Sequence, residues 1–264
     1  MRKSLRSGQS WFFPPDWEVV MQRIKMIVQY DGSQYHGFQL QANAHTVQAA
    51  LQDAISKLSG ERRPLLFAGR TDAGVHAVGQ VIACDTNAGI PPERWATALN
   101  SVLPDDIRVL HSQPAALDFH PRFQAVCKHY TYKIYRSPLG AVFNRHYAWC
   151  NFEALDVRAM QEACGYLLGR NNFKSFCASG SSVKNFTRTM SRCELQQEGD
   201  YLCLQLSADG FLYHMVRIIM GTLVEIGRGR WEPGQMASII AQQDRKYAGP
   251  TAPPQGLYMV RVDY

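Results

Sequence analysis

Apolar and polar positions recur along the chain with two different periods, which predict helices and strands in turn. Residues 47–58 carry apolar side chains at helical spacing, with Thr46 as the expected N-cap and Gly60 as the expected stop. Residues 215–227 are apolar on nearly all sides, which is typical of a buried helix. Three further helices are predicted over residues 92–100, 157–168 and 233–242.

Runs of β-type residues predict strands between these helices. The run over residues 24–30 ends at Asp31-Gly32, a strong turn signal, and residues 190–195 and 201–208 form a predicted hairpin. Other strands are expected over residues 65–68, 78–85, 107–115, 128–136 and 257–262. Because strands and helices alternate irregularly and hairpins occur, the pattern predicts an α+β fold with mixed or antiparallel sheets rather than a doubly wound parallel sheet.

The same pattern divides the chain into an extension and two halves. Residues 1–22 contain Trp11, Phe12, Phe13 and Trp17 and are expected to be a mobile tail; an RNA-contacting arm or a mistaken start are the alternatives. Residues 23–118 are expected to form an N-terminal α+β half, and residues 119–264 a C-terminal one. The order of elements in the two halves is loosely similar, which suggests a duplication without establishing it.

Composition adds a basic charge and many aromatic side chains. The chain has 28 Lys and Arg against 22 Asp and Glu, a formal charge of +6, together with 12 Tyr, 12 Phe and 5 Trp. Cations bind phosphates and aromatic rings stack on exposed bases, so this composition favours a nucleic-acid partner. An ordinary basic enzyme would show the same charge, and that alternative stays open.

Cysteine spacing and hydropathy bear on compartment, metal and membrane. The seven cysteines form no Cys-x-x-Cys pair and several lie in apolar stretches, which indicates reduced, packed thiols in a cytoplasmic protein. Cysteines and histidines together show no zinc spacing, so we expect no metal. The longest apolar run, residues 211–224, is too short and too interrupted to span a membrane, and the N-terminus has no secretory signal pattern.

The most informative motif is Gly-Arg-Thr-Asp-Ala-Gly-Val-His-Ala at residues 69–77. It places Asp72 on a loop between two predicted strands and between two glycines, which permit tight turns and close approach. Arg70 stands two residues earlier, and a carboxylate beside a guanidinium is held ionised, as a nucleophile requires. A simple Asp-Gly turn would look the same, so the loop alone leaves a turn and a catalytic site equally open.

Two residues of the second half favour the catalytic interpretation. Arg217 is the only residue of fixed charge within residues 211–224, and an unpaired buried guanidinium is costly, so we expect a carboxylate partner. That partner is either a structural one or Asp72, reached across a cleft between the halves. Tyr130 lies in a basic stretch of a predicted strand and either packs on the core or stacks on a flipped base.

Several other chemistries are not supported. Phosphate-loop, dinucleotide-binding and Gly-x-Ser-x-Gly signatures are absent from the sequence. Five histidines share no metal spacing, and each is expected to be a surface or packing residue rather than a general base: His36, His76, His120, His129 and His214.

Taken together, these motifs resemble those of the TruA family of tRNA pseudouridine synthases. The resemblance centres on residues 69–76 and runs in order from about residue 24 to the C-terminus, so it covers nearly the whole chain. Its other segments are residues 30–32, 35–39, 46–48, 98–100, 103–107, 119–122, 128–132, 210–217, 249–253 and 256–257.

The resemblance implies isomerisation of uridine to pseudouridine at positions 38, 39 and 40, in the anticodon stem-loop of tRNA. Asp72 would be the nucleophile, Tyr130 would stack on the flipped base, and Arg217 would hold the Asp72 carboxylate. Arg70 would displace the uridine or occupy its place, and Leu257 would contact the uracil. The resemblance also implies a pseudouridine synthase fold with a basic cleft between its halves, and a homodimer that binds tRNA across both subunits without cofactor or metal.

This chemistry agrees with the residues, since moving the glycosidic bond from N1 to C5 involves neither redox change nor hydrolysis. Asp72 could attack C6 of uracil or C1′ of ribose, or act as a base in a glycal-type route, and the sequence does not choose. Two other functions stay open. A non-catalytic RNA-binding or RNA-chaperone module would leave Asp72 unexplained, and a hydrolase with a carboxylate nucleophile lacks a second acid–base carboxylate motif.

Overall fold

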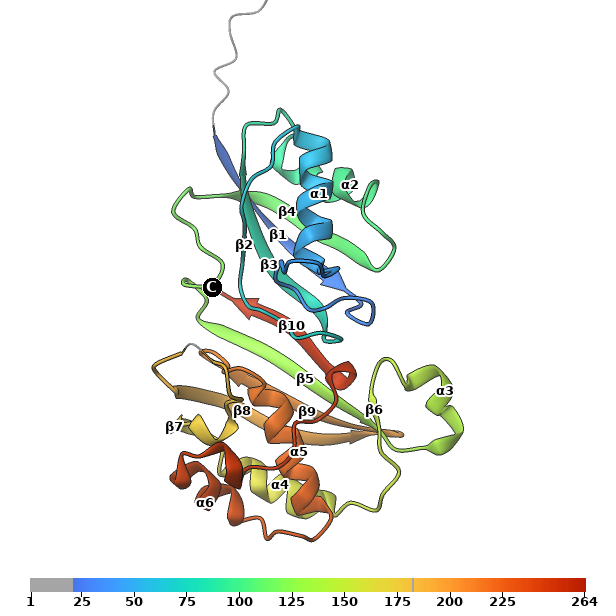
Figure 1. Ribbon diagram of the computed structural model, residues 1–264, viewed down its shortest axis with the longest axis vertical. Helices are drawn as coiled ribbons and strands as arrows, with labels where there is room; N and C mark the ends of the chain where they lie inside the picture. Colours follow the sequence, from blue (N-terminus) through green and yellow to red (C-terminus); the bar gives the residue numbers. More distant parts are fainter. Residues whose placement is uncertain (1–20, 182) are drawn as a thin grey trace, which may run out of the picture.

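The computed structural model describes residues 21–181 and 183–264, whose ten strands form one continuous sheet (Figure 1). The strand order is β4-β1-β3-β10-β5-β9-β8-β7, with β2 paired to β3 and β6 paired to β5. The strands are β1 (Gln22–Tyr30), β2 (Leu65–Phe67), β3 (His76–Thr86), β4 (Ile107–Ala115), β5 (Cys127–Tyr135), β6 (Trp149–Cys150), β7 (Gly169–Asn172), β8 (Thr187–Glu198), β9 (Tyr201–Ala208) and β10 (Leu257–Asp263).

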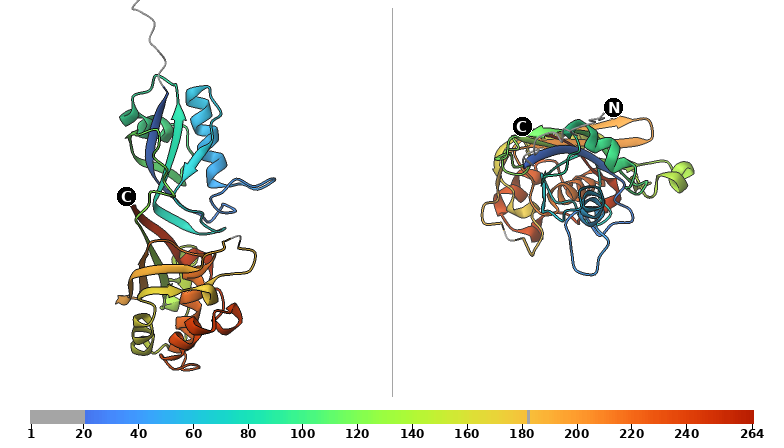
Figure 2. Two further views of the ribbon diagram at one scale, coloured as in Figure 1. Left: turned by 90° about the vertical axis from the view of Figure 1, so that its left-hand side faces the viewer. Right: turned by 90° about the horizontal axis from the view of Figure 1, so that it is seen from above.

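Helices pack beside both ends of this sheet. They are α1 (Val47–Ser59), α2 (Trp95–Asn100), α3 (Ala141–Asn144), α4 (Val157–Gly165), α5 (Met215–Gly227) and α6 (Gln235–Gln242). The first two lie with the N-terminal strands, and α4, α5 and α6 lie with the C-terminal strands, so the molecule is drawn out along one axis (Figure 2). Short 3₁₀ turns occupy Pro92–Arg94, Pro138–Gly140, Lys174–Phe176, Arg245–Tyr247 and Pro254–Gly256.

The last strand joins the two halves. β10 pairs in parallel with β3 through Tyr258 and His76, and antiparallel with β5 along its length, starting with Leu257 opposite Tyr132. Among the described strands, only β10–β3 and β5–β6 pair in parallel, so the sheet is mixed and mostly antiparallel. The α+β prediction is therefore confirmed, but a single sheet replaces the separate sheets that the pattern suggested.

The long helices begin and end where the sequence predicts. The Thr46 hydroxyl accepts a hydrogen bond from the Ala49 amide at 3.3 Å, and Gly60 closes α1 with a left-handed φ of 71°. Helix α5 spans the 13 residues that were expected, and every one of them is buried except Arg217. Its apolar surface therefore forms much of the core beneath β5 and leaves one cation at the boundary of that core.

Some expected boundaries are wrong. The extension was expected to end at residue 22, but Gln22 already belongs to β1, because its backbone pairs with Thr86 and its side-chain amide reaches the Ala88 carbonyl. The rest of the expected tail, residues 1–20, lies outside the described residues. Helix α4 ends at Gly165, and Leu168 is half-exposed beyond it.

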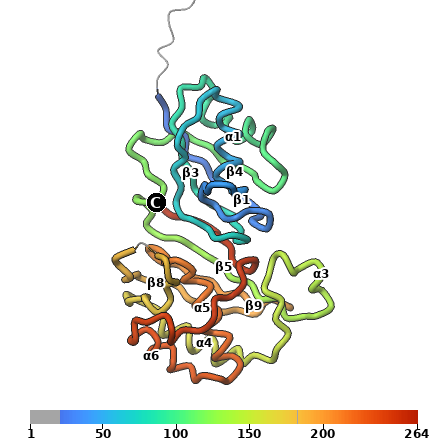
Figure 3. The backbone as a smooth tube through the Cα atoms, in the orientation of Figure 1, coloured from blue at the N-terminus to red at the C-terminus, as the bar shows by residue number. Residues whose placement is uncertain are grey.

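The short elements α3, β6 and β7 were not predicted, since each is too brief for a periodic pattern to develop. The segment that carries α3 extends sideways from the C-terminal half (Figure 3). Its large apolar residues Leu139 and Phe143 are 95% and 83% exposed.

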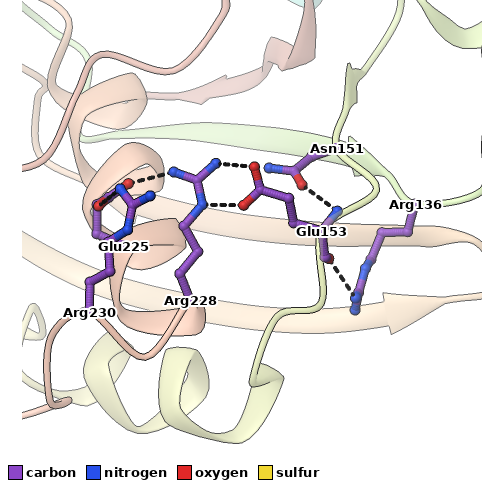
Figure 4. A network of polar contacts seen from close by, with 6 residues as sticks. All are labelled: Arg136, Asn151, Glu153, Glu225, Arg228 and Arg230. Atoms are coloured by element: carbon purple, nitrogen blue, oxygen red, sulfur yellow. Dashed lines mark hydrogen bonds and ion pairs between the residues drawn. The ribbon is translucent and has the colours of Figure 1, made fainter.

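The C-terminal end of α5 is fixed by a network of charged groups (Figure 4). Arg228 spans two carboxylates: it forms a paired contact with Glu153 and a 2.6 Å bond to Glu225. Arg230 donates to the other oxygen of Glu225 at 2.8 Å. The side-chain oxygen of Asn151 accepts a hydrogen bond from the Glu153 backbone amide. The network therefore connects α5 to the chain after β6.

Candidate active site

The loop that carries Asp72 is held in place by the connection between β1 and α1. The Phe38 amide donates to the Thr71 carbonyl at 3.0 Å, and the Tyr30 hydroxyl bonds the Thr71 hydroxyl at 2.8 Å. Gly37 has a φ of +90°, and a Cβ there would lie 2.7 Å from the Thr71 oxygen. Only glycine can therefore sit against this loop, and Asp72 is presented on a fixed backbone.

The two glycines that flank Asp72 have different functions. Gly74 adopts a left-handed φ of 76° and closes a turn in which the Val75 amide donates to the Asp72 carbonyl at 3.1 Å. Gly69 has no left-handed conformation, but a Cβ there would lie 3.0 Å from the terminal methyl of Met259 on β10. The expected tight turn is thus made by Gly74, while Gly69 permits close approach of the last strand.

The Asp72 carboxylate is bound on one side only. Arg217 donates to Oδ2 at 2.8 Å, and the Nε2 atom of His214 lies 3.4 Å from the same oxygen. No hydrogen bond from the described residues reaches Oδ1. With the side chain 22% exposed, the structure holds the carboxylate by Oδ2 and leaves Oδ1 open.

Two nitrogens of the Arg217 guanidinium are fixed by hydrogen bonds. Besides the Asp72 contact, its Nε donates to the Ala252 carbonyl at 2.8 Å, and the Ala252 amide donates back to the Arg217 carbonyl at 3.1 Å. The pairing with Asp72 that the sequence offered as one of two possibilities is therefore present, between partners 145 positions apart in the chain.

Tyr130 reaches the same loop from β5. Its hydroxyl oxygen lies 3.8 Å from the position that a Cβ on Gly69 would take, and its ring packs edge-on against Phe211 at 4.8 Å. Burial raises the pKa of this phenol well above its usual range, and the charges of Tyr30 and Asp72 raise it further. Tyr130 is therefore a neutral hydroxyl beside the carboxylate loop.

Lys128 is a half-buried cation on the same strand. Its Nζ donates to the Ala68 carbonyl at 2.6 Å, and no carboxylate of residues 21–181 or 183–264 pairs with it. Burial lowers its pKa to about 8, helped by the cations Arg122 and Arg188. Sequence analysis assigned it no function, although its place two residues before Tyr130 puts both side chains on one face of the strand.

The remaining expected site residues are less constrained. Arg70 is exposed and forms no ion pair with any described residue, so the guanidinium beside Asp72 belongs to Arg217 and not to Arg70. Leu257 begins β10, 6% exposed, next to the Tyr258–His76 pair that joins β10 to β3. Their functions remain predictions.

Two histidines of the motifs behave differently from one another. His76 is buried and accepts the Gly32 amide at 3.1 Å, as a packing residue does. His214 was assigned to the same class, but its ring lies against the Asp72 carboxylate. The only signal in the sequence was its position three residues before Arg217, which places both on one face of a helix start.

One group in the described residues has the composition of a metal site. The ligand atoms of Cys127, His129 and Asp263 lie within 4.8 Å of one another. Their hydrogen-bonding capacity is already used: His129 contacts Asp263 at 2.7 Å and Ser207 at 2.8 Å, and Arg261 pairs with Asp263 at 2.8 Å. A cation here would have to displace the Arg261 guanidinium, so the donors do not fit a resident metal.

No helix of the described residues has the length and the apolar character that a membrane span requires. All seven cysteines lie in the described residues and none forms a disulfide.

Comparison with known proteins shows which protein family the chain resembles in sequence. A sequence profile of the family described as tRNA pseudouridine synthase matches residues 26–124 and 163–264. A tRNA pseudouridine synthase A from Syntrophomonas wolfei is 59% identical over 244 residues, 92% of this chain and 98% of the relative. One from Moorella thermoacetica is 50% identical over 243 residues, 91% of this chain and 99% of the relative.

Among solved structures, an H/ACA RNP bound to a substrate RNA containing 2′-deoxyuridine gives a TM-score of 0.33 at 9% identity, over 76% of this chain and 53% of that chain, which is too low to carry an argument. The sequence matches are sufficient by themselves. They agree with the α+β architecture and with a carboxylate loop built between two strands. The chain belongs to the tRNA pseudouridine synthase family of isomerases.

Proposed function

We propose that this protein converts uridine to pseudouridine at positions 38, 39 and 40 of tRNA, with Asp72 as the nucleophile. Membership of the family supports isomerisation in tRNA, and the three positions follow from the resemblance of its motifs to TruA. The observation that carries the proposal is the one-sided carboxylate: Arg217 occupies Oδ2, and Oδ1 is left without a partner among the described residues.

The neighbouring residues suit a flipped base. A uridine inside a helical stem must leave the stack before its C5 and C1′ atoms can be reached, at a cost of a few kcal/mol. Tyr130, whose hydroxyl lies near Gly69, would offer its ring as an aromatic surface for the base, and Leu257 would offer an apolar contact. Arg70 lies exposed on the Asp72 loop without an ion-pair partner among the described residues, so it would be available to enter the space that the base vacates.

Cations without carboxylate partners support an RNA substrate. Arg70 lies two residues before Asp72, and Lys128 donates to the Ala68 carbonyl, just before the Asp72 loop. Neither cation pairs with an acid of the described residues. The chain as a whole carries a formal charge of +6. These charges would be neutralised by the phosphates that flank the target nucleotide.

Three further assignments complete the proposal. The protein would work as a homodimer, for which the exposed Leu139 and Phe143 of the α3 segment offer apolar surface of the kind that interfaces bury. It would act in the cytoplasm, in keeping with its unpaired cysteines. The halves 23–118 and 119–264 would hold the RNA in a basic cleft between them, with β10 as the shared strand.

The first test is Asp72→Asn. This change removes the negative charge and the nucleophile while keeping the shape of the side chain. We expect product formation to fall by at least about 10³-fold, as for other catalytic nucleophiles. Tritium release from tRNA labelled at uracil C5 measures turnover directly, because the C5 hydrogen is lost when C5 becomes bonded to ribose.

Asp53→Asn on the exposed side of α1 is the matched control and should keep full activity. Asp72→Asn should still bind tRNA and remain folded at the assay temperature, although loss of the charged partner of Arg217 should lower its melting temperature. Turnover by this variant would contradict the assignment of Asp72. A parent protein that binds tRNA without releasing tritium would instead be the non-catalytic RNA-binding module, which family membership does not favour.

A further inference from the structure

We propose that His214 is a positioning residue for the reaction: together with Arg217 it binds Oδ2 of Asp72 and so makes Oδ1 the reacting oxygen. This inference rests on the proposed function, since it concerns the same carboxylate. Sequence analysis placed His214 among ordinary packing residues, and no general-base function was expected of it.

The geometry supports a shared function for the two side chains. Nε2 of His214 lies 3.4 Å from Oδ2, the oxygen to which Arg217 donates at 2.8 Å. His214 is the N-cap of α5 and Arg217 stands three residues later, so both side chains leave the same face of the first turn. A carboxylate with one oxygen bonded to Arg217 and flanked on the same side by an imidazole presents its other oxygen to a substrate.

The backbone of His214 indicates that this contact has a function. Its φ of 59° is left-handed, and among the described residues only Asn43 and Gln243 share that conformation without being glycine. Left-handed backbone is unfavourable for a residue with a Cβ, and such strain persists where the surroundings enforce it. Nor does the imidazole cap its own helix, as an N-cap side chain usually would. It reaches the carboxylate instead.

The charges around the imidazole favour its neutral form. Burial lowers the pKa of His214 below its usual 6.5, Arg217 and Arg245 lower it further, and Asp72 acts in the opposite direction. Tyr213 also neighbours the imidazole of His214, and the centroids of the two rings are 3.9 Å apart. Near pH 7 the neutral ring can therefore donate Nε2–H to Oδ2 without adding a second full charge to that oxygen.

Protonation of His214 changes this balance. Imidazolium would place two cations on one carboxylate and reduce the electron density available at Oδ1. Activity should therefore decline as pH falls through the pKa of His214, and this decline should belong to His214 alone. A residue that served only to fill space would produce no such pH dependence.

The experiment compares three variants at position 214. His214→Gln keeps an N–H donor, His214→Phe keeps the ring shape without a donor, and His214→Gly removes the side chain and relieves the left-handed strain. We expect kcat to fall about 10²-fold in the Phe and Gly variants, as for a misplaced reacting group, with KM and tRNA affinity unchanged. The Gln variant should keep most of the activity and lose the acid limb of the pH profile.

His214→Gly should also melt at or above the parent temperature, which separates its loss of activity from loss of fold. His111→Gln, at an exposed position on β4, is the matched control and should change neither kcat nor the pH profile. Wild-type kcat in the Phe or Gly variant would overturn the proposal. So would a Gln variant as inactive as the Phe variant, because that result would mean that the imidazole itself transfers a proton.

A second measurement does not depend on turnover. The ¹³C signal of the Asp72 carboxyl carbon should report the protonation of His214 in the parent protein and lose that step in His214→Phe. Absence of the step in the parent protein would overturn the inference even if the enzyme is active. If the parent protein released no tritium but showed the step, the proposed function would fail while the contact stood.

Discussion

Helix α5 ends in arginine–carboxylate pairs at both termini, and the two pairs are built differently. At its C-terminal end, Arg228 and Arg230 bind both oxygens of Glu225, and Arg228 also makes a paired contact with Glu153 (Figure 4). At its N-terminal end, Arg217 and His214 both lie against Oδ2 of Asp72, and Oδ1 has no partner among the described residues. Glu225 is therefore hydrogen-bonded at both oxygens, whereas Asp72 is hydrogen-bonded at one.

The difference separates a structural ion pair from a reactive one. A carboxylate bonded to arginines at both oxygens stabilises the fold and presents neither oxygen freely to a substrate. A carboxylate held by one oxygen is fixed in place and still reactive at the other. Burial alone would not have distinguished them, since Glu225 is the more buried of the two, with 9% of its side chain exposed against 22% for Asp72.

Among changes within and beside α5, the largest effect should come from Arg217→Lys. Lysine keeps the charge, but its donors radiate from one nitrogen and do not reproduce the two separate nitrogens with which Arg217 contacts Asp72 and the Ala252 carbonyl. We expect kcat to fall about 10²- to 10³-fold, as when a preorganised donor is removed. Single-turnover kinetics with excess enzyme measure this step without product release.

Arg228→Lys at the other end of the helix is the matched control, because it makes the same substitution in the network around Glu225. It should lower the melting temperature slightly and leave kcat unchanged. Equal losses of activity in the two variants would mean that the two ends of α5 do not differ in function.

Glu225→Gln should have an intermediate effect, and on stability instead of activity. The change removes the anion between Arg228 and Arg230 while keeping its shape. Losing hydrogen bonds to a charged group should reduce the free energy of unfolding by about 1–3 kcal/mol. Urea denaturation checks this value, and kcat per folded molecule should be that of the parent protein. A fall in kcat would mean that the network around Glu225 also affects the position of Asp72.

The smallest effect concerns Lys128. Unlike Arg217 and Arg228, it pairs with no carboxylate of the described residues. Its pKa of about 8 means that it is charged at pH 7 and mostly neutral at pH 9. If it binds an RNA phosphate, tRNA affinity should weaken by up to about tenfold over that interval, which is the free energy of one charged hydrogen bond. Fluorescence anisotropy with labelled tRNA at constant ionic strength measures the change.

Lys128→Met should remove that part of the pH dependence and reduce the slope of log affinity against log salt by about one. Lys57→Met, in the last turn of α1, is the control and should keep both properties. A Lys128→Met variant with unchanged salt and pH dependence would show that Lys128 serves only to hold the Ala68 carbonyl.

Local elements of the fold could be predicted because their signals are local. Thr46 and Gly60 bracket α1 by capping, and the unbroken apolar run of α5 fixes its length. The position of β10 could not be predicted, since pairing between strands far apart in sequence leaves no periodic trace. The same reason explains why two sheets were expected where the chain forms one.

The candidate site was predictable to the extent that charge is costly to bury. A lone guanidinium in an apolar helix required a partner, and Asp72 is that partner. His214 could not be recognised in this way, because an imidazole is tolerated in many environments and its contact depends on a left-handed backbone. Arg70 was expected beside Asp72 on sequence proximity, yet it forms no ion pair with an acid of the described residues.

The central position of β10 has a consequence for synthesis on the ribosome. β3 and β5 are translated long before the strand that lies between them, so a growing chain presents two open sheet edges that only Leu257–Asp263 can close. Until then the carboxylate loop and the tyrosine strand have no shared strand to align them. Chains that lack β10 are thus exposed to edge-to-edge aggregation, and catalytic competence requires that this strand has been made and paired.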